Sequence, residues 1–280
     1  MAEPRAWQHR TGEVVLDRTR IMGVLNVTPD SFSDGGLYDS PDAAVSRALR
    51  MVEEGADVID LGGESTRPGA DPVPADVEWS RVGPVLARLA GKLDVPISID
   101  TRKPEIAEKA LEAGASIVND VSAFRAAGMA EVVAAVGAGA VLVHMLGEPK
   151  TMQAAPTYAD VAQEVRDFLE ARVKEAIGVG VEPLAIAVDP GIGFGKTVEH
   201  NVQLLRQLDV IAGLGRPIVV GVSRKSFLER LGAGGPGERL PGGIAAAAYA
   251  VLRGADVVRT HDVLETARAM RAVDALRPRP

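Results

Sequence analysis

The chain has 280 residues, a formal net charge of −7 at pH 7 and no cysteine. A chain of this length buries about three quarters of its surface on folding, so it needs neither a disulfide nor a metal ion to stay folded. The absence of cysteine excludes disulfides, cysteine-ligated zinc or iron–sulfur centres and a thiol nucleophile. The acidic balance excludes a nucleic-acid partner bound through bulk charge, although it allows a local anion site.

The first twenty residues contain several charged side chains and no apolar core, so we expect no secretory signal. No run of the sequence approaches the roughly 18 apolar residues that a membrane-spanning helix needs. We therefore expect a cytoplasmic protein that does not bind membranes.

Short apolar runs alternate with amphipathic stretches along the chain. The runs are rich in Val and Ile and apolar at successive positions, which is typical of strands buried on both faces of a parallel sheet. We expect strands at 21–27, 58–61, 95–99, 116–118, 140–144, 185–188, 218–222 and 256–258. We expect helices at 41–54, 76–91, 104–113, 127–137, 158–178, 198–212, 241–253 and 262–275.

Eight strand–helix pairs predict an α/β fold, a single (β/α)8 TIM barrel, whereas five or six pairs would favour an open doubly wound sheet. No linker interrupts the pattern, so residues 1–280 are expected to form one domain. Within it, residues 20–276 are assigned to the barrel. Residues 1–19 are assigned to a short N-terminal hairpin, turning at Thr11 and Gly12, that covers the bottom of the barrel.

A polar or charged residue follows every expected strand, where a barrel places its chemistry. A helix cap or a turn is an equally good explanation for Ser223, Asp120 and Asp262, because such side chains satisfy free backbone amides. Capping does not require basic side chains. The basic residues at these positions are His144, Lys225, Arg259 and His261.

The charges divide into two groups. Lys225, Arg259 and His261 follow the last two strands, a part of such barrels that often binds phosphate. Asp100 and Asp189 follow the third and sixth strands, where a partly desolvated carboxylate is costly unless it is paired. A ring edge with several N–H groups would pair with it. The sequence thus predicts a ligand with an N–H-rich ring and a phosphate or diphosphate tail.

A metal ion would have to arrive with this ligand. Asn26 offers one amide oxygen, and Mg²⁺ usually combines one or two protein oxygens with phosphate oxygens and waters. The four histidines lack metal-ligand spacing. The glycine-rich stretches at 191–197 and 232–237 lack the spacing or the strand–turn–helix context of nucleotide-binding loops.

Two long motifs resemble the signatures of the dihydropteroate synthase family: MGVLNVTPDSFSDGG at 22–36 and GGESTRPG at 62–69. Further stretches, ISIDTRKP, VNDVS, DPGIGFGKT, VGVSRKSF and VRTHDV, follow in the family's order, so the resemblance covers roughly residues 20 to 272. It implies a TIM-barrel transferase of folate biosynthesis and a target of sulfonamides. Such enzymes condense p-aminobenzoate with 6-hydroxymethyl-7,8-dihydropterin diphosphate, giving 7,8-dihydropteroate and diphosphate.

The resemblance also implies roles for individual residues. The pterin ring would be held by Asp100, Asn119, Asp189 and Lys225, with Met145 and Phe194 along the pocket. The diphosphate would be bound by Asn26, Arg259 and His261, with Asn26 beside Mg²⁺. The p-aminobenzoate side would be formed by Phe32, Asp34, Thr66, Arg67, Pro68 and Ser226.

The implied mechanism breaks the C–O bond before the amine attacks, without a covalent enzyme intermediate. The residues with catalytic roles would be Asp34, Asp100, Lys225, Arg259 and His261. The sequence departs from the family at Thr260, where Val is more usual, and at Ala123, where Gly is usual, and we expect only local packing effects. The family often forms dimers through helices near the C-terminus, so a homodimer is expected.

Three alternatives to a synthase can be distinguished by these residues. A pterin-binding methyltransferase would share the carboxylates but would not need the TPDSFSDGG loop or the cluster of Lys225, Arg259 and His261. A catalytically silent pterin-binding paralogue should lack some of the loop or anion-site residues, and none is missing here. A general phosphosugar barrel would not need both Asp100 and Asp189.

Overall fold

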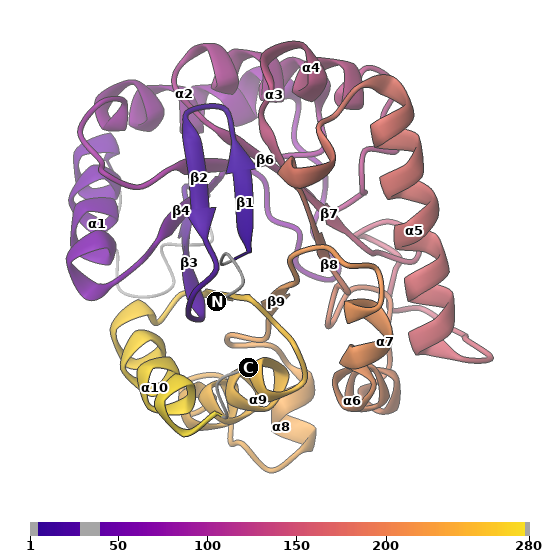
Figure 1. Cartoon of the computed structure of the whole chain (residues 1–280). Coiled ribbons are helices and arrows are strands. Elements are labelled where there is room, and N and C mark those ends of the chain that lie inside the picture. Colours follow the sequence, from indigo (N-terminus) through magenta and orange to yellow (C-terminus); the bar gives the residue numbers. More distant parts are fainter. Residues whose placement is uncertain (1–4, 29–39, 278–280) are drawn as a thin grey trace.

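Eight parallel strands surround the centre of the molecule, with helices on the outside, in a computed structural model that describes residues 5–28 and 40–277 (Figure 1). The strands neighbour one another in the order β8-β7-β6-β5-β4-β3-β10-β9. One isolated bridge, Val188–Ile218, brings β8 beside β9, so the barrel is nearly closed. The strands are β3 (Arg20–Asn26), β4 (Val58–Gly62), β5 (Ile97–Asp100), β6 (Ile117–Asp120), β7 (Gly139–Val143), β8 (Ile186–Asp189), β9 (Val219–Gly221) and β10 (Val257–Thr260).

The helices between the strands confirm the expected alternation. They are α1 (Pro41–Glu54), α2 (Ala75–Leu89), α3 (Pro104–Glu112), α4 (Met129–Val136), α5 (Val161–Val179), α6 (Val198–Arg206), α7 (Leu208–Ala212), α8 (Phe227–Arg230), α9 (Leu240–Leu252) and α10 (Val263–Leu276), with a 3₁₀ turn at Pro183–Ala185. Two details differ from the expectation. The helix at 198–212 is divided because the backbone of Gln207 leaves the helical region, at φ −110° and ψ 29°. The short α8 was not expected, because four residues are too few to show helical periodicity.

The N-terminal hairpin closes the bottom of the barrel, as expected. Strands β1 (Ala6–His9) and β2 (Gly12–Val15) pair in antiparallel fashion. The ring of Trp7 is fully buried, and its Nε1 donates to the carbonyl oxygen of Ala185, just before β8. The hairpin thereby seals the end of the barrel at which the strands begin.

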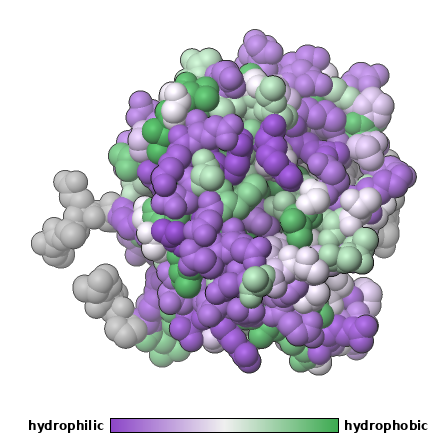
Figure 2. Space-filling model, turned by 90° about the vertical axis from the view of Figure 1, so that its right-hand side faces the viewer, coloured by the Kyte–Doolittle hydropathy of each residue, from purple (hydrophilic) through white to green (hydrophobic). Residues whose placement is uncertain are grey.

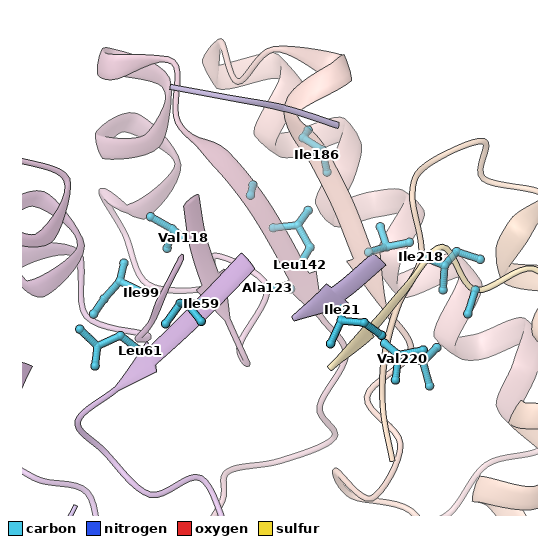
Figure 3. Packing of buried hydrophobic residues seen from close by; sticks show 14 of the residues in the cluster. Ile21, Ile59, Leu61, Ile99, Val118, Ala123, Leu142, Ile186, Ile218 and Val220 are labelled. Carbon is cyan, nitrogen blue, oxygen red and sulfur yellow. The ribbon is translucent and has the colours of Figure 1, made fainter. Parts of the chain in front are cut away.

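Side chains along each strand alternate between two apolar layers, because successive strand residues point to opposite faces. One layer lies between the strands and the helices; it includes Ile21, Ile59, Ile99 and Val220 (Figure 3). The other layer fills the inside of the barrel, above Trp7; it contains Met22, Val58, Ile117, Val141, Ala187, Val219 and Val257. This alternation decides which polar residues face inward at the open end.

The outer surface is mainly polar. Figure 2 shows one face on which hydrophilic residues predominate and hydrophobic ones are scattered among them. Among the residues that the structure describes, no helix is long and apolar enough to cross a membrane.

Candidate active site

Four neighbouring strands end in a row of paired positions. Asn26 of β3 is paired with Gly62 of β4, Gly62 with Asp100 of β5, and Asp100 with Asn119 of β6. Because side chains alternate along a strand, Asn26 and Gly62 face inward like Met22 and Val58, and Asn119 faces inward like Ile117. Asp100 is paired with Asn119 and faces the same way, so these positions are directed into the mouth of the barrel. Gly62 has no side chain, and a Cβ there would lie 3.5 Å from both Asn26 Oδ1 and Asp100 Cβ. The row therefore leaves a gap between Asn26 and Asp100.

The same rule brings two further strands into the mouth. Asp189 comes two residues after the inward-facing Ala187 of β8, and Arg259 two residues after Val257 of β10. The structure thus brings together residues that are far apart in sequence. We call the following residues the strand-end cluster: Asn26, Asp60, Asp100, Asn119, Asp189, Lys225 and Arg259.

Arg259 forms ion pairs with two carboxylates in this cluster. Its Nε donates to Asp60 Oδ2 and its Nη2 to Asp100 Oδ2, both at 2.6 Å. Burial alone would lower the pKa of Arg259, but the charges of Asp60 and Asp100 raise it, so the guanidinium stays charged. The positive and negative groups are therefore interleaved, rather than separated into two halves as the sequence had indicated.

Asp60 is a member of the site that the sequence analysis missed. It lies inside β4, is fully buried, and also accepts a hydrogen bond from Asn119 Nδ2 at 3.0 Å. The sequence pattern points to the positions at the end of each strand, and Asp60 is one inward-facing position deeper. An acidic residue within the apolar run VIDLG was the signal that could have revealed it.

Two buried acceptors in this network have no donor. Asp60 Oδ1 and Asn119 Oδ1 are inaccessible to solvent and have no hydrogen-bond partner among the described residues. An unsatisfied buried acceptor costs about 1–3 kcal/mol, so a ligand that supplies N–H or O–H donors would be bound favourably here.

Burial also changes the acidity of the two carboxylates expected to face the ligand. It raises the pKa of Asp100 to about 7, although the charge of Arg259 opposes the change. It raises the pKa of Asp189 as well, against the effects of Lys225 and of the hydrogen bond from Gly191 N to Asp189 Oδ1 at 2.7 Å. Both groups are thereby less strongly acidic than a free carboxyl.

Lys225 lies opposite Asp189 and beside an aromatic ring. Its ammonium group donates to the carbonyl oxygen of Ile192 and lies 4.3 Å from the centre of the Phe194 ring. Burial lowers its pKa to about 8, although Asp189 opposes the change. Met145 is buried in the inner apolar layer, whereas Ser226, the next residue after Lys225, is exposed.

His261 follows β10 and contacts the loop after β9. Its Nδ1 is 3.1 Å from Ser223 Oγ. Burial, together with the charges of Arg224, Arg259 and the more distant Arg67, lowers the pKa of His261 to about 3. The imidazole is therefore neutral near pH 7 and offers a hydrogen bond rather than a charge.

The interpretation as a cap or turn residue is correct for Asp120, which stabilises the turn after β6, but not for Asp262. Asp120 points away from the barrel centre and accepts hydrogen bonds from the backbone amides of Ser122 and Phe124, at 2.7 and 2.8 Å. Asp262 makes no capping bond to α10 and instead forms an ion pair with Arg224 at 2.8 Å.

His144 lies on the outer side of β7, away from the barrel mouth. Its Nδ1 is 2.8 Å from Nζ of the buried Lys196, which also donates to the carbonyls of Gly191 and Phe194. The edge of the His144 ring packs against Phe168. The pair supports the glycine-rich loop after β8 from behind.

Three of the residues expected to bind p-aminobenzoate follow β4. Phe32 and Asp34 lie outside the described residues, so their expected roles remain predictions. Residues 63–72, which we call the second loop, carry Thr66 half-buried and Arg67 and Pro68 exposed. The loop is fastened to the segment after β7, since Gly69 N donates to Pro149 O at 3.1 Å.

The residues present fit a metal ion that arrives with its ligand. No group of three or more His, Asp or Glu residues within the described ranges could hold a metal ion. The side-chain amide of Asn26 makes no hydrogen bond to any described residue, so its oxygen is available in the barrel mouth. One protein oxygen beside a phosphate-binding group matches the way Mg²⁺ is commonly bound.

Comparison with known proteins gives a consistent result. Residues 22–261 match the model of the pterin binding enzyme family. A dihydropteroate synthase of Neisseria meningitidis serogroup C is 49% identical over 96% of this chain and 97% of its own.

Two solved structures are similar over nearly the full length. A Xanthomonas albilineans dihydropteroate synthase with 4-aminobenzoic acid has a TM-score of 0.91 and 44% identity, covering 99% of this chain and 100% of its own. The Yersinia pestis dihydropteroate synthase in a sulfonamide drug complex has a TM-score of 0.93 and 40% identity, covering 97% of this chain and 98% of its own.

Proposed function

The chain belongs to the dihydropteroate synthases, within the family of pterin binding enzymes, and from this premise we propose how its residues share the reaction. The enzyme is a transferase that condenses p-aminobenzoate with 6-hydroxymethyl-7,8-dihydropterin diphosphate, giving 7,8-dihydropteroate and diphosphate. The individual roles that follow are assigned from the contacts of the strand-end cluster and the second loop.

The pterin ring is held by the carboxylate and amide oxygens of the strand-end cluster. The observation that carries this assignment is the pair of buried acceptors, Asp60 Oδ1 and Asn119 Oδ1, that have no donor among the described residues. The aminopyrimidine edge of a pterin presents several N–H groups, which would bind Asp100 and Asp189 and, once the surrounding side chains move aside, these two acceptors. The positive charge of Lys225 balances the negative charge of Asp189.

Met145 and Phe194 supply the apolar contacts of the same pocket. Met145 belongs to the inner apolar layer of the barrel, and Phe194 packs against that layer. The flat pterin ring would lie against both of these apolar side chains while its polar edge meets the carboxylates.

The diphosphate is bound by Arg259, His261 and Asn26. Arg259 uses Nε and Nη2 for its ion pairs, and its Nη1 has no hydrogen-bond partner among the described residues, so that nitrogen can donate to a phosphate oxygen. The neutral His261 offers its Nε2, and a nearby diphosphate raises the pKa of that ring. Asn26 would hold a substrate-borne Mg²⁺, whose role is to neutralise charge on the departing diphosphate.

The p-aminobenzoate side consists of the second loop and Ser226, together with Phe32 and Asp34. Thr66, Arg67 and Pro68 are assigned to this side from the family resemblance, and the loop that carries them follows β4, which lies between β3 with Asn26 and β5 with Asp100. The sulfonamide bound by the related Yersinia pestis enzyme supports a sulfonamide-sensitive site here as well.

The reaction needs charge placement rather than a protein nucleophile. The bond between the pterin methylene carbon and the diphosphate oxygen breaks, and its electron pair leaves with the diphosphate. Asp100, and Asp34 as expected from the family, stabilise the cationic pterin that remains, while Arg259 stabilises the anion. The amine nitrogen of p-aminobenzoate then bonds to the methylene carbon and loses a proton.

A diphosphate-release assay tests this proposal. Release should require the pterin diphosphate, p-aminobenzoate and Mg²⁺ together. Release that needs neither the amine nor Mg²⁺ would contradict the chemistry proposed. The methyltransferase and phosphosugar alternatives would give no amine-dependent release.

The cytoplasmic location remains a prediction. A homodimer is supported by exposed apolar side chains on the last two helices. Tyr249 and Leu252 of α9 and Leu276 of α10 are exposed by 38%, 60% and 85%. Sedimentation equilibrium should give twice the 29.3 kDa of one chain, and a single-chain mass at micromolar concentration would contradict a dimer.

A further inference from the structure

A buried cluster of charges lies outside the strand-end cluster, at the base of the second loop. Lys103 Nζ contacts one carboxylate oxygen of Glu64 and one of Glu78, and Arg102 binds the other oxygen of Glu64 at 3.1 Å. The side chains of Glu64 and Glu78 are only 5% and 1% exposed. Glu78 Oε1 has no hydrogen-bond partner among the described residues. Lys103 is therefore the group that compensates the negative charge of Glu78.

The backbone next to this cluster is packed against α2. A Cβ on Gly63 would lie 2.8 Å from Val82 Cγ1 and 3.0 Å from Glu78 O, so the chain passes too close to the helix for any side chain. Arg81 Nη1 donates to the carbonyl of Gly63 at 2.7 Å. The base of the second loop is thus fixed to α2 by backbone contacts at Gly63 and by charge at Glu64.

The other end of the cluster belongs to the strand that carries Asp100. Lys103 follows Asp100 by three residues and directly precedes α3. Its backbone N donates to Thr101 Oγ1 at 3.2 Å, and Thr101 N donates to the carbonyl of Asn119 at 3.0 Å. The segment that holds Lys103 is therefore fastened to the part of the barrel mouth assigned to the pterin.

Removal of the ammonium group would leave two buried carboxylates facing each other. Glu78 lies in the first turn of α2 and is held by the helix, whereas Glu64 lies at the base of the second loop and could move away from the repulsion while still paired with Arg102. That movement would displace Thr66, Arg67 and Pro68, which follow Glu64 by two to four residues. We propose that Lys103 is a positioning residue, which holds the p-aminobenzoate side in register with the pterin side by bridging Glu64 and Glu78.

This inference rests on the proposed assignment of the second loop to p-aminobenzoate, and steady-state kinetics with each substrate varied separately test it. Lys103→Met should raise KM for p-aminobenzoate at least tenfold and change KM for the pterin diphosphate less than twofold. Lys103→Arg should restore the first value to within threefold of the native enzyme. Glu78→Gln keeps the contact between Lys103 and Glu64 and should raise KM for p-aminobenzoate about threefold. If Lys103→Met does not fold, Glu78→Gln tests the inference in its place.

Lys150, on the segment after β7, provides a matched control because it pairs with the same loop. It pairs with Asp71 at 2.6 Å, but the two side chains are 64% and 76% exposed. Lys150→Met should change neither KM by more than twofold, because exposed ion pairs contribute little. Equal increases of both KM values in Lys103→Met, or an unchanged KM for p-aminobenzoate in a folded variant, would overturn the inference.

Arg67→Ala separates this inference from the function on which it rests. If Arg67→Ala raises KM for p-aminobenzoate and Lys103→Met does not, only the positioning role of Lys103 fails. If Arg67→Ala leaves that KM unchanged, the assignment of the second loop fails, and the inference falls with it.

Discussion

The two sides of the site are built differently. The strand-end cluster is placed by the register of the parallel strands, and its charges are buried and paired with one another. The second loop carries the half-buried Thr66 and the exposed Arg67 and Pro68, and it is fastened at its base and to the segment after β7. The difference supports the division of roles that we propose: the strand ends would fix the electrophile and its leaving group, and the loop would admit and orient the amine. Variants of the two sides can break or sharpen this division.

The largest effect is expected at Arg259. Arg259→Ala removes a donor to the diphosphate and leaves the fully buried Asp60 without a counter-charge. We expect kcat/KM to fall by about 10³-fold and stability to fall by about 3–5 kcal/mol. Steady-state kinetics and urea unfolding measure the two losses.

Companion variants show whether the loss at Arg259 is chemical. Asp100→Asn should reduce kcat/KM by about 10²-fold. Arg18→Ala breaks an Arg–Asp57 pair at the bottom of the barrel, where Arg18 is 44% exposed, and should leave kcat/KM unchanged. Near-native kcat/KM for both Arg259→Ala and Asp100→Asn would contradict the assignment of these residues.

The second effect concerns pH and Lys225. Burial lowers the pKa of this lysine to about 8, so it loses its charge as pH rises through that value. If the ammonium balances Asp189 during pterin binding, kcat/KM should fall about tenfold per pH unit well above pH 8. The Lys225→Arg variant keeps its charge and should lose this limb of the profile. A limb that persists in Lys225→Arg would assign the titration to another group.

The same shift has a consequence for stability, with the opposite sign. Because the pKa is lower in the folded protein than the ordinary 10.5, the unfolded chain binds more protons between about pH 8 and 10.5. The contribution of Lys225 to stability therefore rises with pH across that window. Comparison of Lys225→Met with the native enzyme in urea at pH 7.5 and pH 10 isolates this contribution.

The smallest effect is expected at Ala123, which has no proposed role in the reaction. Its backbone has φ +54°, a left-handed conformation that costs a non-glycine residue about 1–2 kcal/mol. Ala123→Gly should stabilise the protein by about 0.5–1 kcal/mol, after the greater flexibility of glycine in the unfolded chain is subtracted, and should not change kcat/KM. In the matched helical variant, Ala134→Gly, we expect a loss of about 1 kcal/mol. A loss of stability in Ala123→Gly would contradict this account of the strain.

Much of the fold could be predicted from the sequence, because runs of apolar residues and helical periodicity are local signals. The eight strand–helix pairs and the N-terminal hairpin are confirmed, and residues that follow strands, such as Asp100, Asn119 and Arg259, do meet in the barrel mouth. Their roles in binding and catalysis remain predictions.

What could not be predicted depends on distances between separate strands. The burial of Asp60 beneath Arg259 follows from the closure of the barrel, and the sequence alone does not give the register of β10 against its neighbours. The neutral state of His261 depends on burial and on Arg224, Arg259 and Arg67 around it. The family's usual glycine at the position of Ala123 indicates backbone strain, since the φ of Ala123 is +54°, whereas from the sequence we expect only a local packing effect there.

The division between the strand ends and the second loop is tested most directly by equilibrium binding of the pterin diphosphate with Mg²⁺ in the absence of p-aminobenzoate. Titration calorimetry on the native enzyme, Asp100→Asn and Arg67→Ala gives the three dissociation constants. We predict that Arg67→Ala binds within twofold of the native enzyme and that Asp100→Asn binds at least tenfold more weakly. Equal weakening in the two variants, or a greater loss in Arg67→Ala, would contradict the division.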